Sequence, residues 1–275
     1  MRKQKLDLYR YSGTGNKFVL FDLTDVEQKI IFNEKFKKTK RSNIAKKFCK
    51  KFRSTGGDGL VILEKTTGAD LKWDFYNFDG SPAEMCGNAA RCVGLHLTKG
   101  KKTKRPIRLK TKSGIVEISV YSGQKIHVKM SAIKKIKRSE KIRIKSKDLY
   151  FDFINTGVPH ANIQVDQWKL SVQTARLAKY LQKHKYFKPA STNVTFWKYR
   201  RQKTIRAATY ERGVPSYTEA CGTGAVAAAI SFAKKFYIKS PLITVLMPGG
   251  RLQVDLRGKR PILIGPAKRF AKLSI

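Results

Sequence analysis

The sequence predicts an α/β fold built from two similar halves, each a β-sheet wrapped around one mostly apolar helix. Three observations support this prediction. Short strand-like runs bounded by turn residues recur along the 275 residues, whereas helical patterns are few. Two apolar helical runs begin at matching Cys-Gly pairs, one at Cys86 and one at Cys221. A glycine that opens a strand, Gly114 or Gly250, then follows each cysteine at nearly the same distance.

Turn residues separate the expected strands of the first half, which cover residues 17–22, 59–64, 71–78, 107–110, 115–121 and 125–130. A helix is expected over 41–52, where Ile44, Phe48 and Phe52 recur at helical spacing. A second helix, over 86–97, begins at Cys86 and is small and apolar on all sides. Such a helix belongs inside a sheet and not on a surface.

The second half repeats this order. Thr156-Gly157-Val158 precedes an apolar strand, as Thr14-Gly15-Asn16 does near the start of the chain. Helices are expected over 171–184 and 221–236. We therefore predict an N-terminal domain over 1–122 and a C-terminal domain over 123–265, with residues 266–275 packing back on the first domain.

Composition is that of a globular protein, because 41% of the residues are hydrophobic. The first residues carry charges but no apolar segment of the kind found in signal peptides. The longest apolar stretch, over 225–233, is far shorter than the roughly 18 residues that span a bilayer. We expect a cytoplasmic protein that does not enter a membrane.

The charge is strongly basic, with 59 Lys and Arg residues against 19 Asp and Glu residues and a formal net charge of +40. Such a field attracts nucleic acids. However, the basic residues are spread over nearly the whole chain, and no zinc-finger spacing or RNA-recognition motif accompanies them. We interpret the charge as surface decoration and expect no specific nucleic-acid partner.

Four cysteines in a chain of this length do not form a disulfide framework, and their spacing does not fit a zinc site. We therefore expect no bound metal. Cys49 fits the buried face of the helix over 41–52, and Cys92 points away from Cys86 on their shared helix. Only Cys86 and Cys221 stand directly before a glycine, a small polar residue and an alanine-containing run.

A cysteine that opens a helix can be a reactive thiolate. Backbone N–H groups of the first turn have no partner within the helix and carry partial positive charge, so they bind a carboxylate and lower the pKa of a nearby thiol. Gly87 with Asn88, and Gly222 with Thr223, provide two such first turns. Two thiols used as acid and base would move a proton from one face of a carbon to the other, as racemases and epimerases do. The alternative is that both cysteines are merely small residues at helix starts.

Further polar residues stand close to the two cysteines in the sequence. Asn77, Asn193 and Arg212 suit the polar ends of a small substrate, and an arginine grips a carboxylate with two hydrogen bonds. Glu211 could accept a hydrogen bond from a substrate ammonium or pair with a lysine, and His160 could tune a thiol. Taken singly, the asparagines also fit turns or caps, and a lone histidine also fits a structural role.

Together these residues resemble diaminopimelate epimerases over nearly the whole chain. The resemblance rests on a series of short motifs in the same order, at 13–16, 56–59, 77–92, 157–160, 192–193, 211–214, 220–225, 247–250 and 265–267. It implies two similar α/β domains, each a barrel-like mixed sheet around a central helix. It also implies a PLP-independent isomerase that interconverts LL- and meso-2,6-diaminopimelate for lysine or peptidoglycan synthesis, without a cofactor, and a contact between two copies of the chain.

By this resemblance, Cys86 and Cys221 are the acid/base pair, and His160 and Glu211 tune them. The substrate-binding residues would be Asn16, Asn77, Gly87, Asn88, Asn193, Glu211, Arg212, Gly222 and Thr223. The sequence departs from the family pattern at several positions, namely Lys17, Ala89, Val158, the link over 215–219, and Ala271.

Two other functions stay open at this point. One is a PLP-independent racemase of the same two-cysteine type that acts on proline or another amino acid, which would leave Arg212 and Asn193 without a second charged group to bind. The other is a basic nucleic-acid-binding protein whose enzyme site has decayed. An intact set of candidate site residues argues against such decay, namely Cys86, Cys221, Glu211 and Arg212.

Overall fold

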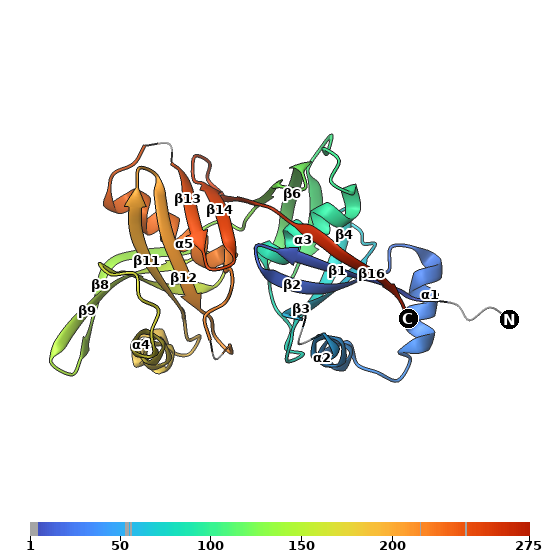
Figure 1. Cartoon of the computed structure of the whole chain (residues 1–275), viewed down its shortest axis with the longest axis horizontal. Helices are drawn as coiled ribbons and strands as arrows, with labels where there is room; N and C mark the ends of the chain where they lie inside the picture. The colour runs from blue at the N-terminus through green and yellow to red at the C-terminus, as the bar shows by residue number, and fades with distance from the viewer. Residues whose placement is uncertain (1–4, 53–54, 56, 215, 240) are drawn as a thin grey trace. The chain divides into compact units, whose positions relative to one another are not determined.

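The computed structural model describes residues 5–52, 55, 57–214, 216–239 and 241–275. The chain forms two compact units, and Figure 1 shows their elements. Unit 1 comprises residues 1–128 and 265–275, and unit 2 comprises residues 129–264. None of the helices in these described ranges is long and apolar enough to span a membrane.

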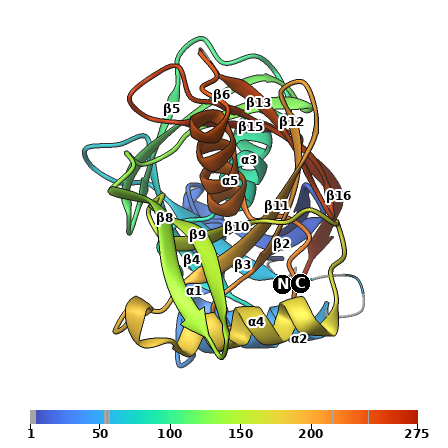
Figure 2. The same cartoon turned by 90° about the vertical axis from the view of Figure 1, so that its left-hand side faces the viewer.

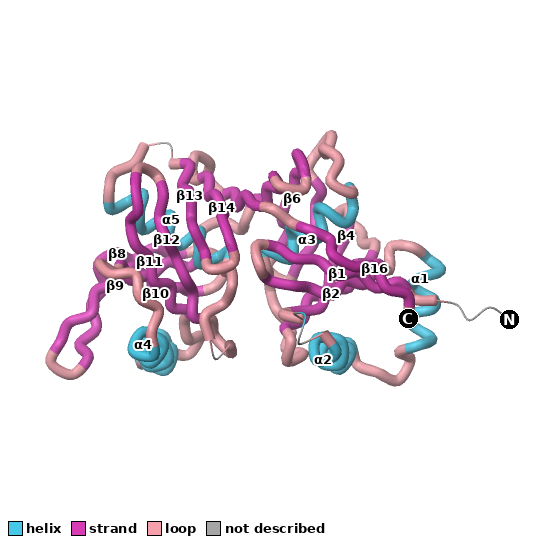
Figure 3. The backbone as a smooth tube through the Cα atoms, in the orientation of Figure 1, coloured by secondary structure: helices cyan, strands magenta, loops and turns pink. Residues whose placement is uncertain are grey.

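Unit 1 contains strands drawn from both ends of the sequence. In chain order its elements are β1 (Asp7–Gly13), β2 (Asn16–Asp22), α1 (Val26–Lys35), α2 (Arg41–Lys51), β3 (Gly59–Glu64), β4 (Leu71–Asn77), α3 (Gly87–Thr98), β5 (Ile107–Thr111), β6 (Gly114–Ser122), β7 (Lys125–Lys129), whose last residue belongs to unit 2, and β16 (Lys268–Ser274). Figure 3 distinguishes these helices and strands by colour.

Unit 2 is a continuous segment. Its elements are β8 (Lys135–Ile144), β9 (Lys147–Asn155), β10 (Pro159–Gln164), α4 (Val172–Lys183), the short 3-10 helix η2 (Lys185–Phe187), β11 (Asn193–Arg201), β12 (Thr204–Tyr210), α5 (Gly222–Lys235), β13 (Leu242–Met247), β14 (Gly250–Asp255) and β15 (Ile262–Gly265), whose last residue belongs to unit 1.

The two units have the same strand order and pairing. The order is β16-β1-β2-β3-β4-β5-β6-β7 in unit 1 and β8-β9-β10-β11-β12-β13-β14-β15 in unit 2. Strands β2 and β3, and β4 and β5, pair in parallel, as do β10 and β11, and β12 and β13. Parallel neighbours need a crossover connection, and helices lie in all four: α1 with α2, α3, α4, and α5.

One buried helix lies inside the sheet of each unit. In α5 nearly every residue from Gly222 to Ala233 is buried, and the helix contacts every strand from β9 to β14 (Figure 2). In α3 all residues from Gly87 to Gly94 are buried, and the helix contacts β1, β2, β6 and β16. The predicted fold class, with a mixed sheet wrapped around a central helix in each domain, is confirmed.

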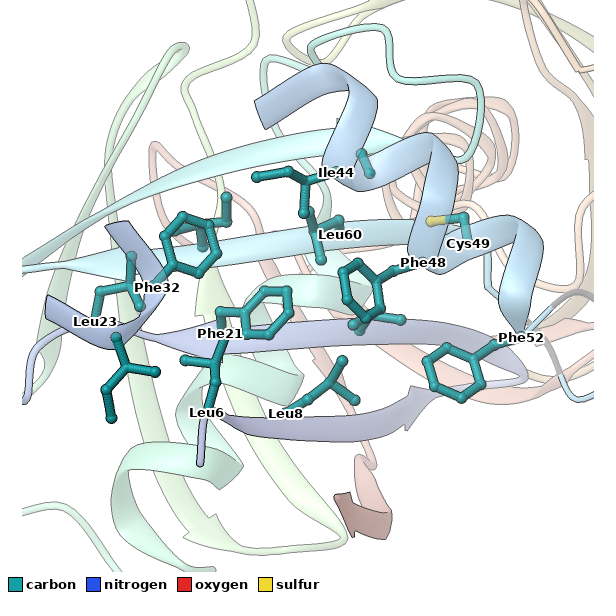
Figure 4. Close-up of a cluster of buried hydrophobic side chains, with 14 residues drawn as sticks. Leu6, Leu8, Phe21, Leu23, Phe32, Ile44, Phe48, Cys49, Phe52 and Leu60 are labelled. Atoms are coloured by element: carbon teal, nitrogen blue, oxygen red, sulfur yellow. The ribbon is translucent and has the colours of Figure 1, made fainter. Parts of the chain in front are cut away.

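One hydrophobic cluster of unit 1 fills the face of the sheet opposite to α3. Leu8 of β1 joins the cluster that α1 and α2 cover (Figure 4), whereas Tyr11 of the same strand hydrogen-bonds to His96 of α3. This alternation follows from the two-residue period of a strand. Burial of both faces of β1 therefore fixes the position of α3 against the sheet.

The expected helices and strands agree with the structure to within a residue or two at each end. Gly114 and Gly250 do open equivalent strands, and both have positive φ, at 107° and 141°. Strands β1 and β16 and several strands of unit 2 had no expected range, and α1 is the α-helix that the sequence did not lead us to expect. Its apolar residues Ile31 and Phe32 are adjacent and give little helical periodicity, although Asp25 caps its first turn by accepting a hydrogen bond from the Gln28 N–H.

Candidate functional site

Cys86 opens α3 in unit 1. It has an extended backbone conformation, with φ −142° and ψ 113°, and its carbonyl accepts the first helical hydrogen bond, from the Ala90 N–H at 2.9 Å. Cys86 is half-buried, and the next two residues, Gly87 and Asn88, are buried in the first turn. The departure at Ala89 is accommodated, since this residue is also fully buried within the helix.

Asn88 and Asn16 are brought together. Asn88 donates a hydrogen bond of 2.9 Å from Nδ2 to Asn16 Oδ1. Asn16 in turn donates to the Asp58 carboxylate at 3.4 Å, and the same carboxylate oxygen accepts from the Lys17 N–H at 2.7 Å. Lys17 thus contributes its backbone here, so its side chain can differ from the family pattern without removing this contact. Gly56, in the neighbouring motif, lies outside the described residues.

Asn77 ends β4 and is held by a tight turn. Its side chain donates to Ser81 Oγ at 3.0 Å, and its carbonyl accepts from the Gly80 N–H at 2.9 Å. Gly80 has a φ of 80°, which favours glycine. Among the described residues, no hydrogen bond joins Asn77 to Asn16 or Asn88.

Arg91 was not predicted as a site residue, yet it lies directly beneath the α3 start. Its side chain is fully buried and donates hydrogen bonds to Asn88 Oδ1 at 2.8 Å and to Thr14 Oγ1 at 2.7 Å. It also donates to the carbonyls of Gly87 and Pro266 at 3.4 and 3.1 Å. Burial lowers the pKa of Arg91 to about 10. The signal in the sequence was a lone charge within an otherwise apolar helical run.

Cys221 opens α5 in unit 2 in the same way. Its carbonyl accepts from the Ala225 N–H at 2.8 Å, and its Sγ accepts from the Gly224 N–H at 3.4 Å. Thr223 Oγ1 lies 3.4 Å from the same sulfur. Unlike Cys86, Cys221 is buried. Its sulfur therefore meets the positive end of the helix, together with a hydroxyl, in a site with little water.

The sequence-based expectation of a lowered thiol pKa is wrong for Cys221. Burial raises the pKa of Cys221 well above its usual value, and the negative charge and hydrogen bond of Glu211 raise it further. The hydrogen bonds from Thr223 and the Gly224 N–H act in the opposite direction but do not compensate. Desolvation of the charged form outweighs the effect of the helix N-terminus, so this cysteine is held as a thiol.

Glu211 follows directly after β12. Its carboxylate accepts a hydrogen bond of 2.8 Å from Thr218 Oγ1, which fixes the side chain beside Cys221. The equivalent position in unit 1 is Asn77, because Tyr76 and Tyr210, the residues before them, form matching isolated bridges with Pro82 and Tyr217. The two cysteines thus follow different polar residues at the same point of the fold. The link from 215 to 219 begins at Pro215, which lies outside the described residues.

His160 connects to Cys221 through Thr223. The ring Nε2 lies 3.0 Å from Thr223 Oγ1, and Nδ1 lies 3.0 Å from Thr195 Oγ1, which is itself 3.0 Å from Thr209 Oγ1. Burial, together with the nearby Arg212 charge, lowers the pKa of His160 to about 3. The ring is therefore neutral, and it can pass or orient a proton through its two hydroxyl neighbours.

Asn193 and Arg212 also belong to this group. The Arg212 N–H donates to Asn193 Oδ1 at 2.8 Å, and Asn193 Nδ2 lies 3.5 Å from His160 Nε2. The register of the parallel strands β10 and β11 places His160 opposite Asn193. The Arg212 guanidinium donates to the Ala190 carbonyl.

The predicted site residues thus fall into two groups, one around the start of each central helix. Unit 1 holds Asn16, Asn77, Cys86, Gly87 and Asn88, and unit 2 holds His160, Asn193, Glu211, Arg212, Cys221, Gly222 and Thr223. Among the described residues, no group of His, Cys, Asp and Glu could hold a metal ion. The arrangement is suited to proton transfer at thiols beside carboxylate-binding N–H groups.

Comparisons with known proteins agree with this chemistry. The family model described as diaminopimelate epimerase matches residues 8–136 and 153–269. The chain is similar to a diaminopimelate epimerase of Aquifex aeolicus, with 33% identity over 91% of this chain and 90% of that protein. It is 36% identical to a diaminopimelate epimerase of Campylobacter lari over 80% of this chain and 78% of that protein. A hydroxyproline epimerase from Agrobacterium vitis shares the fold, with a TM-score of 0.70 and 14% identity over 100% of this chain and 93% of that one.

Proposed function

Because this chain belongs to the diaminopimelate epimerase family, we propose that it interconverts LL- and meso-2,6-diaminopimelate by moving a proton at the α-carbon. The observation that carries this proposal is the pair of cysteines, Cys86 and Cys221, each at the N-cap of a buried helix whose first turn is glycine followed by a small polar residue. We propose that residues 1–122 with 266–275, and residues 123–265, are the two halves of the enzyme and that each supplies one cysteine; the compact units divide a few residues later, between 128 and 129.

The reaction needs one thiolate and one thiol. Cys221 begins as the thiol, since its burial and the Glu211 carboxylate hold its proton. Cys86 begins as the thiolate and takes the α-proton, so that its S–H bond forms as the C–H bond breaks. Cys221 then gives its proton to the opposite face of the same carbon and becomes the thiolate. The reverse direction exchanges the two roles.

Negative charge passes onto the α-carboxylate as the C–H bond breaks. The first-turn N–H groups at Gly87 and Asn88, and at Gly222 and Thr223, are the donors that stabilise this charge. His160 stabilises the Thr223 hydroxyl beside the Cys221 sulfur, since its neutral ring bonds this hydroxyl. No electron-withdrawing cofactor enters these steps. Loss of activity after PLP is stripped from the protein would contradict this mechanism.

The distal end of diaminopimelate is a second amino-acid group, which needs both anion and cation partners. We assign Arg212 and Asn193 to the distal carboxylate, and Asn16, Asn77 and Glu211 to the amines. Asn193 Oδ1 already accepts a hydrogen bond of 2.8 Å from the Arg212 backbone N–H, which holds the two residues next to each other. A substrate without a second charged head, such as proline, would leave these groups without a ligand, and that loss costs affinity when polar groups are buried.

The test is proton exchange followed by NMR. Reduced protein is incubated with LL-diaminopimelate in D2O, and loss of the α-proton signal is compared with appearance of the meso isomer. We expect exchange with inversion, and no exchange with proline. Cys86→Ala and Cys221→Ala should each lose more than the roughly 10²–10⁴-fold that one acid/base group contributes, because inversion needs both thiols. Inversion of proline with no reaction of diaminopimelate would instead assign the protein to the other two-cysteine racemases.

We propose that the product of this reaction serves lysine or peptidoglycan synthesis and that the protein is cytoplasmic. We also propose that the protein forms a homodimer, as the family resemblance implies. Sedimentation of the purified protein tests the dimer, and a single monomeric species at micromolar concentration would contradict it.

A further inference from the structure

The most unusual buried group outside the proposed acid/base pair is the guanidinium of Arg91. Its exposed fraction is 0%, yet in the part of the chain that the structure describes no carboxylate forms an ion pair with it. A buried cation is strongly unfavourable unless hydrogen bonds and an opposite charge compensate it. Hydrogen bonds from the Arg91 guanidinium are present, and the group that carries the opposite charge can be identified from the side chains around it.

The hydrogen bonds of Arg91 all converge on the first turn of α3 and the segments beside it. Two of them reach Asn88 Oδ1 and the Gly87 carbonyl, which belong to the turn after Cys86. The others reach Thr14 Oγ1 and the Pro266 carbonyl, which lie just before β2 and β16. The guanidinium thus joins the helix start to the two segments that precede β2 and β16.

The groups that interact electrostatically with Arg91 are two cysteines, first Cys92 and then Cys86. Cys92 is fully buried, which raises its pKa far above the usual value, so it stays a neutral thiol. The half-buried Cys86 is then the sulfur that can carry the compensating negative charge.

The equivalent helix of unit 2 has the opposite electrostatic character. Five residues after Cys221, where Arg91 stands relative to Cys86, α5 has the buried apolar residue Val226. The residue after the equivalent tyrosines Tyr76 and Tyr210 is also different, with Glu211 beside Cys221 where unit 1 has Asn77. One helix start therefore has a buried cation beneath its cysteine, and the other has an anion beside it.

Other titratable groups around α3 do not change this assignment. Asp58 reaches the helix start through Asn16 and is held by the Lys17 N–H. His96 and Asp22 pair at 2.8 Å near the opposite end of the helix. Glu84 precedes Cys86 in the loop after β4.

We propose that Arg91 is a positioning residue that fixes the first turn of α3 and favours the thiolate form of Cys86. The proposal deepens the proposed function, because it assigns the resting base to Cys86 and leaves Cys221 as the acid. The Arg91 guanidinium hydrogen-bonds to Gly87 and Asn88, so its positive charge also lies close to this turn and favours binding of an anionic carboxylate there.

The test measures alkylation of Cys86 by iodoacetamide against pH, with the modified peptide quantified by mass spectrometry. Only the thiolate reacts, so the midpoint of the rate profile reports the ionisation of this cysteine. Arg91→Gln removes the charge but keeps a polar side chain, whereas Arg91→Lys keeps the charge. We expect Arg91→Gln to raise the midpoint by about one unit or more, which slows labelling about tenfold at neutral pH. Arg91→Lys should keep the midpoint within a few tenths of a unit of the wild-type value, although its turnover falls because the hydrogen-bonding fork is lost.

Arg10→Met is the matched control. Arg10 is also a buried arginine of unit 1, but it stacks on Phe52 and Phe270 and bonds the Thr55 carbonyl, on the face of β1 opposite to α3. This variant should leave the Cys86 midpoint unchanged. If Arg91→Gln folds, as circular dichroism would show, and retains the wild-type midpoint, the proposal is wrong.

Wild-type protein gives an independent check that does not depend on any variant folding. The Cys86 midpoint in the folded chain should lie below that of the same peptide in urea, where a cysteine titrates near about 8.5. An equal or higher midpoint in the folded protein would overturn the proposal. Neither measurement uses turnover, so absence of epimerisation would count against the proposed function without affecting this result.

Discussion

Replacement of Gly224 by alanine tests how closely the start of α5 packs on the sheet of unit 2. A Cβ at this position would lie 2.2 Å from Thr209 Oγ1 and 3.1 Å from Thr195 Oγ1, whereas ordinary van der Waals contact begins at 3.4 Å. Both threonines are fully buried and face each other in the β11–β12 register. Neither hydroxyl can withdraw without breaking the 3.0 Å hydrogen bond between them.

The expected magnitude follows from three effects. Inserting a methyl group into a packed interior costs about 1–3 kcal/mol, and the lost hydrogen bond costs about 1 kcal/mol. Alanine gains up to about 1 kcal/mol over glycine through helix propensity. The unfavourable contact outweighs the gain, so we expect Gly224→Ala to destabilise unit 2 by about 1–3 kcal/mol. We also expect lower turnover, because the Gly224 N–H bonds the Cys221 sulfur and Thr195 bonds His160.

Urea unfolding measured by circular dichroism gives the stability change, and hydrogen exchange of peptides from α5 shows whether the loosening is local. Ala89→Gly is the matched control at the equivalent position of α3, and it should leave exchange in α5 unchanged. Adding Thr209→Ala to Gly224→Ala should recover part of the lost stability, because it removes the atom that the new methyl meets. This account of the packing is refuted if Gly224→Ala is as stable as the wild-type protein, or if adding Thr209→Ala does not restore any of the lost stability.

Two further predictions concern ionisation. Glu211→Gln removes the negative charge beside Cys221 and should lower the alkylation midpoint of this cysteine, measured by peptide mapping; an unchanged midpoint would mean that burial is the whole cause of the raised pKa. In the folded protein the pKa of His160 is about 3, whereas its ordinary value is 6.5. Between these two pH values the imidazole is protonated in the unfolded chain but not in the folded one, so the folded protein loses stability as the pH falls below 6.5. Urea titrations should show a slope of up to about 1.4 kcal/mol per pH unit that is absent in His160→Gln, and parallel profiles for the two proteins would contradict the neutral buried ring.

The elements that place the two cysteines could be predicted because their signals are local. A Cys-Gly pair before an apolar run marks the start of a buried helix, and α3 and α5 begin there. Glycines at strand openings mark positive φ, which Gly114 and Gly250 have. These features depend on neighbouring residues and on periodicity, both of which are visible in the sequence.

The features that escaped prediction depend on contacts between distant segments. The raised pKa of Cys221 comes from burial and from the Glu211 side chain, and a general expectation for helix N-termini omits both. Thr195 reaches His160 because β10 and β11 pair, and Thr209 lies opposite Thr195 in the β11–β12 register. The contacts of Arg91 join α3 to Thr14 and Pro266, which lie far from it in the sequence.

Because β16 belongs to the sheet of unit 1, the two units are completed at different times during translation. Unit 1 places β16 beside β1, and two backbone hydrogen bonds of 2.9 Å between Leu6 and Ile275 continue this pairing. Since β16 follows all of unit 2 in the sequence, it leaves the ribosome after unit 2 has emerged, and unit 2 can fold while unit 1 still lacks a strand. During that interval β1 exposes an unpaired sheet edge, which is a template for pairing with another chain. Nascent chains therefore associate more readily during synthesis than after the fold is complete.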